Sequence, residues 1–173
     1  MSDVMRQGGF DCVIGNPPYV RQESLADFKD YFEKHYDSFD GMADLYVYFM
    51  EKGIRVLKEG GYYSIIVSSS FLRTTFAENL RRFLKKSAAV LRIVDFGGLA
   101  VFTNAKDTYV CVPLLAKLSQ PARIEICRVN TLDFDNLDAV VSRQRYLVLH
   151  ESLTDGAWSM RNSVETALFD KIK

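Results

Sequence analysis

The sequence predicts an α/β fold with a mostly parallel sheet, an antiparallel last strand and a small C-terminal extension. Apolar runs at residues 10–14, 62–67 and 90–96 have the length of buried strands. Between them, segments 43–57 and 74–86 carry apolar residues at helical spacing. Alternating strands and helices are typical of a parallel sheet, because each helical crossover brings the chain back to start the next strand in the same direction.

Turn-forming residues and connection lengths predict where these elements end. Pro17 and Pro18 follow the first run, and two consecutive prolines exclude both a helix interior and a central strand. Gly60 and Gly61 are expected to stop the first helix. The apolar run 109–118 is expected to pair antiparallel with the strand before it, since the connection is short. We expect the sheet to finish with this strand.

The part of the chain after residue 118 is expected to form a separate subregion. It contains two short strand-like runs at 124–129 and 145–150, separated by polar turns, and a helical pattern at 162–173. The predicted division is therefore a main unit at residues 1–118 and an extension at residues 119–173.

Composition narrows the class of protein. A chain of 173 residues with 48% apolar and 25% charged residues has the balance of one soluble domain. Its longest apolar run is far shorter than the roughly 20 residues that span a bilayer, and its N-terminus lacks a secretory pattern. A cytoplasmic protein without a membrane partner is expected. The formal net charge is zero, so a nucleic acid would have to be held by local patches.

The cysteines predict neither a disulfide framework nor a metal site. There are three, widely spaced and without a C-x-x-C pattern. Cys12 and Cys111 lie in apolar runs, so both are expected to be buried thiols.

The strongest candidate for chemistry is Asn16-Pro17-Pro18-Tyr19, directly after the first predicted strand. Strands of open parallel sheets point their carboxyl ends at the ligand crevice. A conjugated amine is a weak nucleophile because its lone pair is delocalised. The side-chain oxygen of Asn16 and the main-chain oxygen of Pro17 can accept its two hydrogens and localise that pair, while Tyr19 stacks on a flat base. The alternative is a surface turn that ends a strand.

The sequence around this motif resembles the gamma-class adenine-N6 DNA methyltransferases of restriction-modification systems, including the fused type IIG enzymes. The resemblance covers roughly residues 10–117. It rests on DCVIGNPPYVRQE (11–23), ADLYVYF (43–49), LKEGG (57–61) and IIVSSSFL (65–72). It implies the C-terminal half of a Rossmann-like S-adenosylmethionine-dependent methyltransferase fold, and transfer of a methyl group to an adenine flipped out of double-stranded DNA.

The resemblance also implies roles for individual residues. Phe102 would stack on the target adenine from the side opposite Tyr19, and Phe49 would face the adenine of S-adenosylmethionine. The alternatives are a core residue closing a glycine-rich loop for Phe102 and an ordinary core aromatic for Phe49. The full set implied is Asn16, Pro17, Pro18 and Tyr19 for catalysis, Tyr19 and Phe102 for base stacking, and Phe49 and Pro18 for the cofactor.

This sequence departs from the family pattern at its start. The family has a glycine-containing loop and an acidic residue before the motif, and these hold most of the cofactor, whereas only nine residues precede Phe10 here. The region of Trp158 resembles the connector to a target-recognition domain. We therefore expect residues 1–118 to be the catalytic half and residues 119–173 a connector. The N-terminal cofactor-binding half and the target-recognition domain are expected outside this chain.

Two further expectations concern charged residues. Asp44 is expected to cap the helix that follows it or to stabilise its N-terminus by charge, with direct cofactor contact as the alternative. A basic cluster around the second helix is expected to be a solvated face, with phosphate contact as the alternative. The cluster comprises Arg73, Arg81, Arg82, Lys85 and Lys86.

Two rival functions remain open from the sequence. A glutamine side-chain amide in a protein presents the same nitrogen chemistry, but residues 20–23 resemble the DNA enzymes. A non-catalytic DNA-binding or assembly module would keep the fold without cofactor.

Overall fold

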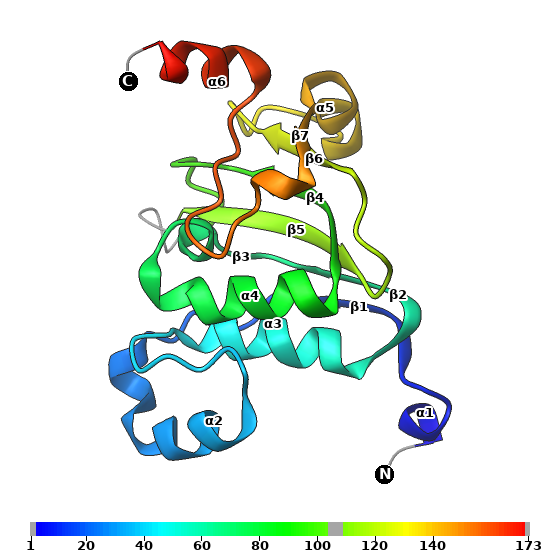
Figure 1. The fold of residues 1–173 in the computed structure, drawn as a ribbon, viewed down its shortest axis with the longest axis vertical. Coiled ribbons are helices and arrows are strands. Elements are labelled where there is room, and N and C mark those ends of the chain that lie inside the picture. The colour runs from blue at the N-terminus through cyan, green and yellow to red at the C-terminus, as the bar shows by residue number, and fades with distance from the viewer. Residues whose placement is uncertain (1–2, 104–108, 172–173) are drawn as a thin grey trace.

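Seven strands of the described residues form one sheet. The computed structural model describes residues 3–103 and 109–171 (Figure 1). The strand order is β1-β2-β5-β4-β6-β7, and β3 also pairs with β5. The strands are β1 (Phe10–Gly15), β2 (Leu57–Ile65), β3 (Val67–Ser68), β4 (Ala89–Asp95), β5 (Val110–Ala116), β6 (Arg123–Arg128) and β7 (Tyr146–Leu149).

Helices connect these strands and account for most of the remaining regular structure. The α-helices are α1 (Asp3–Arg6), α2 (Lys29–His35), α3 (Leu45–Val56), α4 (Glu78–Ser87), α5 (Leu137–Gln144) and α6 (Ser163–Asp170). The 3-10 helices are η1 (Gln22–Phe28), η2 (Ser69–Leu72), η3 (Thr75–Ala77) and η4 (His150–Ser152). None of the described helices is both long enough and apolar enough to cross a membrane.

The predicted fold class is confirmed. β1 pairs parallel with β2, and β4 pairs parallel with β6. β5 is antiparallel to both of its neighbours, β2 and β4, so these two strands point the same way. β7 is antiparallel to β6 and closes the far edge. Only β5 and β7 therefore run against the common direction of the described strands.

The expectation that the sheet finishes with the strand at 109–118 is wrong. β5 turns back into the gap between β2 and β4 rather than adding to an outer edge. The other edge of β4 therefore stays open and pairs with β6, which is followed by β7. The division at residue 118 stays a prediction, although β6 and β7 continue the sheet begun by the first part of the chain.

Pro113 lies inside β5, a central strand, where proline is normally excluded because it lacks an N–H. The ladder explains its position. On the β2 side, β5 pairs with β3 up to Cys111 and with β2 from Leu114 onward. Pro113 therefore lies in the gap between the two paired segments. The missing donor therefore costs no ladder hydrogen bond there, and the Pro113 carbonyl accepts a bond of 3.1 Å from the Ser64 hydroxyl.

One face of the sheet is covered by α3 and α4, which lie side by side across it (Figure 1). Apolar residues of both helices join the main core, including Met50, Ile54, Leu80 and Leu84. Gly53 allows the close approach of α3 to β2, since a Cβ there would lie 2.3 Å from the Tyr63 ring. These contacts fix β2, and with it the strand end that reaches the site.

The opposite face is covered less evenly. On this face, a smaller core over β4 and β6 includes Val94, Cys127 and Val141 of α5. At the near end, Ile14 is 79% exposed, and Cys12 is exposed as well. The expected burial of Cys12 is therefore wrong, because β1 is an edge strand whose alternate side chains point away from α3. Cys111 is buried, as expected.

The first helix ends four residues before the expected glycine stop. α3 ends at Val56, and Gly60 and Gly61 lie inside β2. Gly60 adopts a φ of 79°, and the β1–β2 register shifts between Phe10 and Cys12. The glycines thus form an irregularity of the strand, and the pairing becomes regular from Tyr62 onward, towards the site.

Candidate functional site

The Asn16-Pro17-Pro18-Tyr19 turn leaves the carboxyl end of β1, as predicted. The Gly15 carbonyl accepts a hydrogen bond of 3.1 Å from the Ile66 amide, and the Pro18 carbonyl accepts one of 3.1 Å from Val20. Pro17 is buried, whereas Asn16 and Tyr19 are exposed. The backbone of the turn is therefore fixed at both ends while its polar side chains face outward.

The two acceptors proposed from the sequence are unoccupied by other groups of the described chain. Neither the Asn16 side chain nor the Pro17 carbonyl makes a hydrogen bond to a described residue. Asn16 lines a shallow hollow of about 390 Å³ together with Ser64, Ile66 and Val112. An amino group can thus be received there without breaking an internal bond.

Tyr19 is held near the end of β2. Its hydroxyl donates a long bond of 3.4 Å to the Ile66 carbonyl. Burial, and to a smaller extent the nearby Cys111, raises the pKa of Tyr19 to about 12. The phenol is therefore neutral at physiological pH and its ring remains available for stacking.

The structure brings Tyr19 and Phe102 together. Their ring centroids are 5.6 Å apart and the ring planes are inclined by 69°, an edge-to-face contact. A base between two parallel rings needs about 7 Å, twice the carbon contact distance of roughly 3.5 Å. The two rings must therefore reorient before a base can lie between them. Phe102 is also partly buried against the smaller core.

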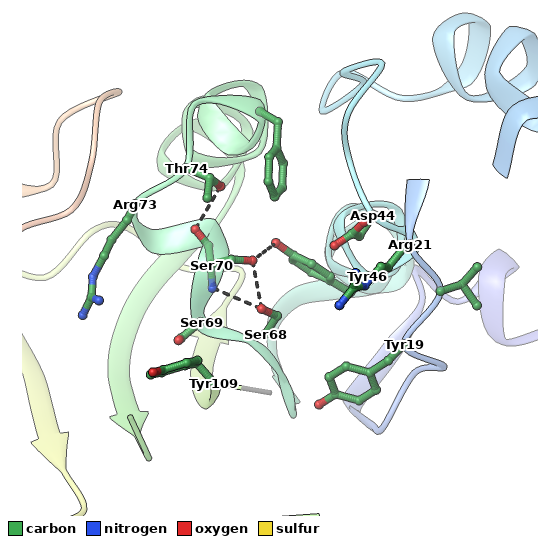
Figure 2. Close-up of a pocket in the computed structure, with 12 residues that line it drawn as sticks. Tyr19, Arg21, Asp44, Tyr46, Ser68, Ser69, Ser70, Arg73, Thr74 and Tyr109 are labelled. Carbon is green, nitrogen blue, oxygen red and sulfur yellow. Dashed lines mark hydrogen bonds between the residues drawn. The ribbon is translucent and has the colours of Figure 1, made fainter. Parts of the chain in front are cut away.

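A cavity of about 740 Å³ adjoins the motif and has two walls (Figure 2). Residues 16–21, the motif wall, contribute Tyr19, Val20 and Arg21. Residues 68–74, the serine wall, contribute three consecutive serines with Arg73 and Thr74. The remaining lining residues are Asp44, Tyr46, Phe76 and Tyr109. Asn16 lies in the separate hollow, and Phe102 does not line this cavity.

The hydroxyl groups of the serine wall bond to one another. The Ser70 hydroxyl lies 2.9 Å from the Tyr46 hydroxyl and 2.8 Å from that of Ser68 (Figure 2). Thr74 donates to the Ser70 carbonyl at 2.9 Å. The sequence did not identify this wall as part of a site. The available signal was a run of serines directly after a buried strand, at the sheet edge where ligands bind.

Asp44 ties the motif wall to α3. Its carboxylate accepts a bond of 3.0 Å from the Gln22 amide, and the Leu45 amide donates to the Val20 carbonyl at 3.0 Å. Asp44 occupies the N-cap position but makes no side-chain capping bond, so the expected capping bond is wrong, and stabilisation of the helix N-terminus by its charge stays a prediction. Burial raises the pKa of Asp44, partly offset by the Gln22 bond. Its role is to position the loop that follows the motif.

The basic cluster around α4 is not a uniform solvated face. Arg81 is only 1% exposed and donates to the carbonyls of Phe71, Thr74 and Asp155 at 2.6, 2.8 and 3.0 Å. Burial lowers the pKa of its guanidinium. Arg82, by contrast, forms exposed ion pairs with Glu78 and Asp155. Arg81 thus fastens the serine wall to the C-terminal segment.

Trp158 reinforces this connection. It is buried, its amide donates to the Leu72 carbonyl at 2.7 Å, and its indole lies edge-on to Phe71 at 6.1 Å. The segment expected to be a connector is therefore packed against the back of the serine wall.

Phe49 lies on α3 and is 42% exposed, so the alternative of an ordinary core aromatic is excluded. It lines neither of the two hollows described above. Its contact with a cofactor stays a prediction.

Comparison with known proteins assigns this architecture to a family. The sequence profile described as Eco57I restriction-modification methylase matches residues 1–102, from before β1 to Phe102. The chain belongs to this family. It is 35% identical over 112 residues to the type II restriction enzyme and methyltransferase RM.Eco57I of Escherichia coli, covering 62% of this chain and 11% of that protein. It is 38% identical over 105 residues to the type II methyltransferase M.BstVI of Geobacillus stearothermophilus, covering 60% and 18%.

Solved structures share the fold at low sequence identity. The type IIG restriction endonuclease BpuSI matches with a TM-score of 0.65 and 17% identity, over 86% of this chain and 20% of that chain. A type I restriction-modification assembly matches with a TM-score of 0.68 and 13% identity, over 95% and 42%. The chain spans less than a fifth of the length of the two curated relatives described above.

Proposed function

We propose that this chain carries the base-handling half of a site-specific DNA methyltransferase that transfers a methyl group from S-adenosylmethionine to N6 of adenine. The observation that supports it most is the turn after β1, where two hydrogen-bond acceptors that have no partner among the described residues lie beside Tyr19. In this proposal, the remaining cofactor-binding residues and the target-recognition domain belong to other parts of a longer protein.

The proposed chemistry follows from these acceptors. The Asn16 side-chain oxygen and the Pro17 carbonyl accept the two N6 hydrogens, which makes the nitrogen more tetrahedral and directs its lone pair at the methyl group. The nitrogen would take the methyl group from the sulfonium sulfur, the electrons of the broken bond would stay on a neutral thioether, and the surplus proton on the nitrogen would pass to water. Because the prolines hold the Pro17 carbonyl and the Asn16 backbone in place before the base arrives, positioning contributes much of the rate.

Residues of this chain also fit an aromatic base and an aromatic cofactor ring. Tyr19 and Phe102 would stack on a flipped adenine once their rings reorient, which offsets the cost of unpairing it. Phe49, with its exposed ring, and Pro18, exposed in the motif turn, would contact S-adenosylmethionine. When bound, that cofactor supplies a methyl group activated on a sulfonium sulfur.

DNA is favoured over a protein amide as the substrate. The curated relatives are named as type II methyltransferases, and the matching family profile is described as a restriction-modification methylase. A protein glutamine offers a similar nitrogen but no planar ring for the pair Tyr19 and Phe102 to hold.

Asn16→Ala in the complete protein tests the proposal. We expect the methylation rate to fall by a factor of roughly 100 to 1,000, since one preorganised polar partner of the transition state is lost. The matched control is Asn130→Ala, an exposed asparagine after β6, which should stay within about twofold. The measurement is methyl incorporation into duplex DNA, followed by chromatography of the nucleosides. Retained activity in Asn16→Ala, or label on cytosine rather than adenine, would contradict the proposal.

A further inference from the structure

The arginines of the chain differ in whether they have acceptors. Most form ion pairs or carbonyl bonds, as Arg55, Arg81, Arg82, Arg92, Arg128 and Arg145 do. Arg21 and Arg73 are both exposed, and neither side chain makes a hydrogen bond or ion pair with a described residue. Both line the cavity beside the motif.

These two arginines lie on opposite sides of that cavity. Figure 2 shows Arg73 on the serine wall and Arg21 across from it, with Tyr46 and the serines between. Their backbones are fixed, since the Arg73 amide donates to the Ser70 carbonyl at 3.0 Å and the Gln22 amide next to Arg21 is held by Asp44. Among the described lining residues, the two arginines outnumber the one acidic side chain, Asp44, so these residues together carry a positive charge.

We propose that Arg21 and Arg73 bind the two backbone phosphates that flank the flipped target nucleotide, one on each side of the cavity. This inference rests on the proposed function and names the part of the DNA that these residues contact. A nucleotide that leaves the duplex remains joined to its strand by a 5′ and a 3′ phosphodiester. Both groups therefore lie next to the site of the base, and Tyr19, which would stack on that base, lines this cavity beside the hollow of Asn16.

The chemistry of the cavity favours a phosphodiester. A guanidinium offers parallel N–H donors that match two phosphate oxygens, and charge-assisted bonds of this kind are the strong ones. Neither arginine forms an ion pair with a described residue, although the charge of Arg21 helps to lower the pKa of Asp44. Tyr19 and Tyr109 line the same space, and arginines beside exposed aromatic rings are typical of sites that hold a single strand by its backbone and bases.

The serine wall explains why these cations, rather than the hydroxyls, meet the backbone. The Ser68, Ser70 and Tyr46 hydroxyls bond to one another. Because the whole chain has no net charge, a localised pair of cations also decides where a polyanion binds.

The experiment measures binding of this chain to a labelled DNA duplex with one unpaired adenine, by fluorescence anisotropy between roughly 50 and 200 mM salt. No cofactor or methyl transfer is needed. We expect Arg21→Ala and Arg73→Ala each to weaken binding about fivefold to tenfold and to lower the slope of log affinity against log salt by about one. Arg73→Lys keeps the charge, so it should keep the slope.

Arg143→Ala is the matched control. Arg143 is an exposed arginine of α5 that makes no hydrogen bond or ion pair with a described residue and does not line the cavity. It should leave affinity and slope unchanged, and thermal unfolding should show that all variants are folded. Equal losses for Arg143→Ala and Arg73→Ala, unchanged slopes for both cavity variants, or no binding by the unchanged chain would overturn the inference.

The two proposals fail separately. Unchanged salt slopes together with loss of methylation in Asn16→Ala would reject the phosphate contacts and leave the methyltransferase intact. Lower slopes in the arginine variants together with full activity of Asn16→Ala would reject the proposed chemistry and keep the DNA contact.

Discussion

The two walls of the cavity are built in opposite ways. The motif wall is held through its backbone, Asp44 and the long bond of Tyr19 to the Ile66 carbonyl, and the polar groups of Asn16 and Pro17 have no partner among the described residues. In the serine wall, the Ser68 and Ser70 hydroxyls bond to each other, and the buried Arg81 holds the wall by donating to the Phe71 carbonyl. One wall thus offers reactive groups on a short fixed turn, and the other supplies a rigid surface.

This difference explains where each wall is vulnerable. Removal of a free acceptor costs little folding energy, because nothing in the protein depends on it. Removal of an anchor loosens a wall without touching the chemistry. The roles of the two walls can therefore be distinguished by measuring both the free energy of unfolding and the methylation activity of the same variants.

The largest effect on stability is expected from the anchor of the serine wall. Arg81→Met should lower the free energy of unfolding by roughly 3 kcal/mol, because three carbonyl oxygens lose a charged donor in a buried place. Arg82→Met is the matched control, since its ion pairs are exposed and should cost less than about 1 kcal/mol. Urea unfolding of both variants gives the comparison. Equal losses would show that Arg81 does not anchor this wall.

A smaller effect is expected from the anchor of the motif wall. Asp44→Ala should cost about 1 kcal/mol, because one hydrogen bond to the Gln22 amide is lost. Asp44→Asn keeps an oxygen acceptor and should remain close to the unchanged chain. In the complete protein, Asp44→Ala should also slow methylation, since the loop after the motif is released. If Asp44→Asn is as unstable as Asp44→Ala, the carboxylate has a role other than accepting this bond.

The parts of the fold that depend on local pattern were predictable. The apolar runs gave β1, β4, β6 and β7 close to their observed positions, and helical spacing gave α3 and α4. The helices α2 and α5 were not predicted. The position of β5 between β2 and β4 was not predicted either, because strand order depends on pairing between segments far apart in the chain.

The candidate site also has parts that the local sequence predicts and parts that depend on contacts between distant segments. The motif turn was predictable, since a double proline after a strand is a local signal. The clamp of Tyr19 and Phe102 on a base was expected only through family resemblance; the structure places the two rings edge to face, and stacking on a base stays a prediction. The serine wall was missed because its bond between Tyr46 and Ser70 joins two elements. The burial of Arg81 was missed because its guanidinium donates to three carbonyls from different segments. An acidic partner at helical spacing would have been visible in the sequence, and these carbonyls were not.

The smallest effect near neutral pH is expected from Tyr19→Phe. The long, exposed bond to the Ile66 carbonyl contributes little, so the free energy of unfolding should change by less than about 0.5 kcal/mol. The ring, and therefore stacking, is kept. At high pH the variant should differ. The pKa of Tyr19 is raised from 10.0 to about 12 in the folded chain. The stability linked to its neutral phenol is therefore fully present below pH 10, and the chain loses that stability as pH rises towards 12.

Tyr19→Phe should therefore lose less stability than the unchanged chain between pH 10 and 12. Burial also raises the pKa of Tyr46 and Tyr63, so both proteins will still weaken there. Tyr62→Phe, an exposed phenol on β2, serves as the matched control. Urea unfolding at several pH values measures the difference. Parallel stability curves for Tyr19→Phe and the unchanged chain would show that the hydroxyl is as solvated in the folded state as in the unfolded one, and the motif wall would then be more open than the structure has it.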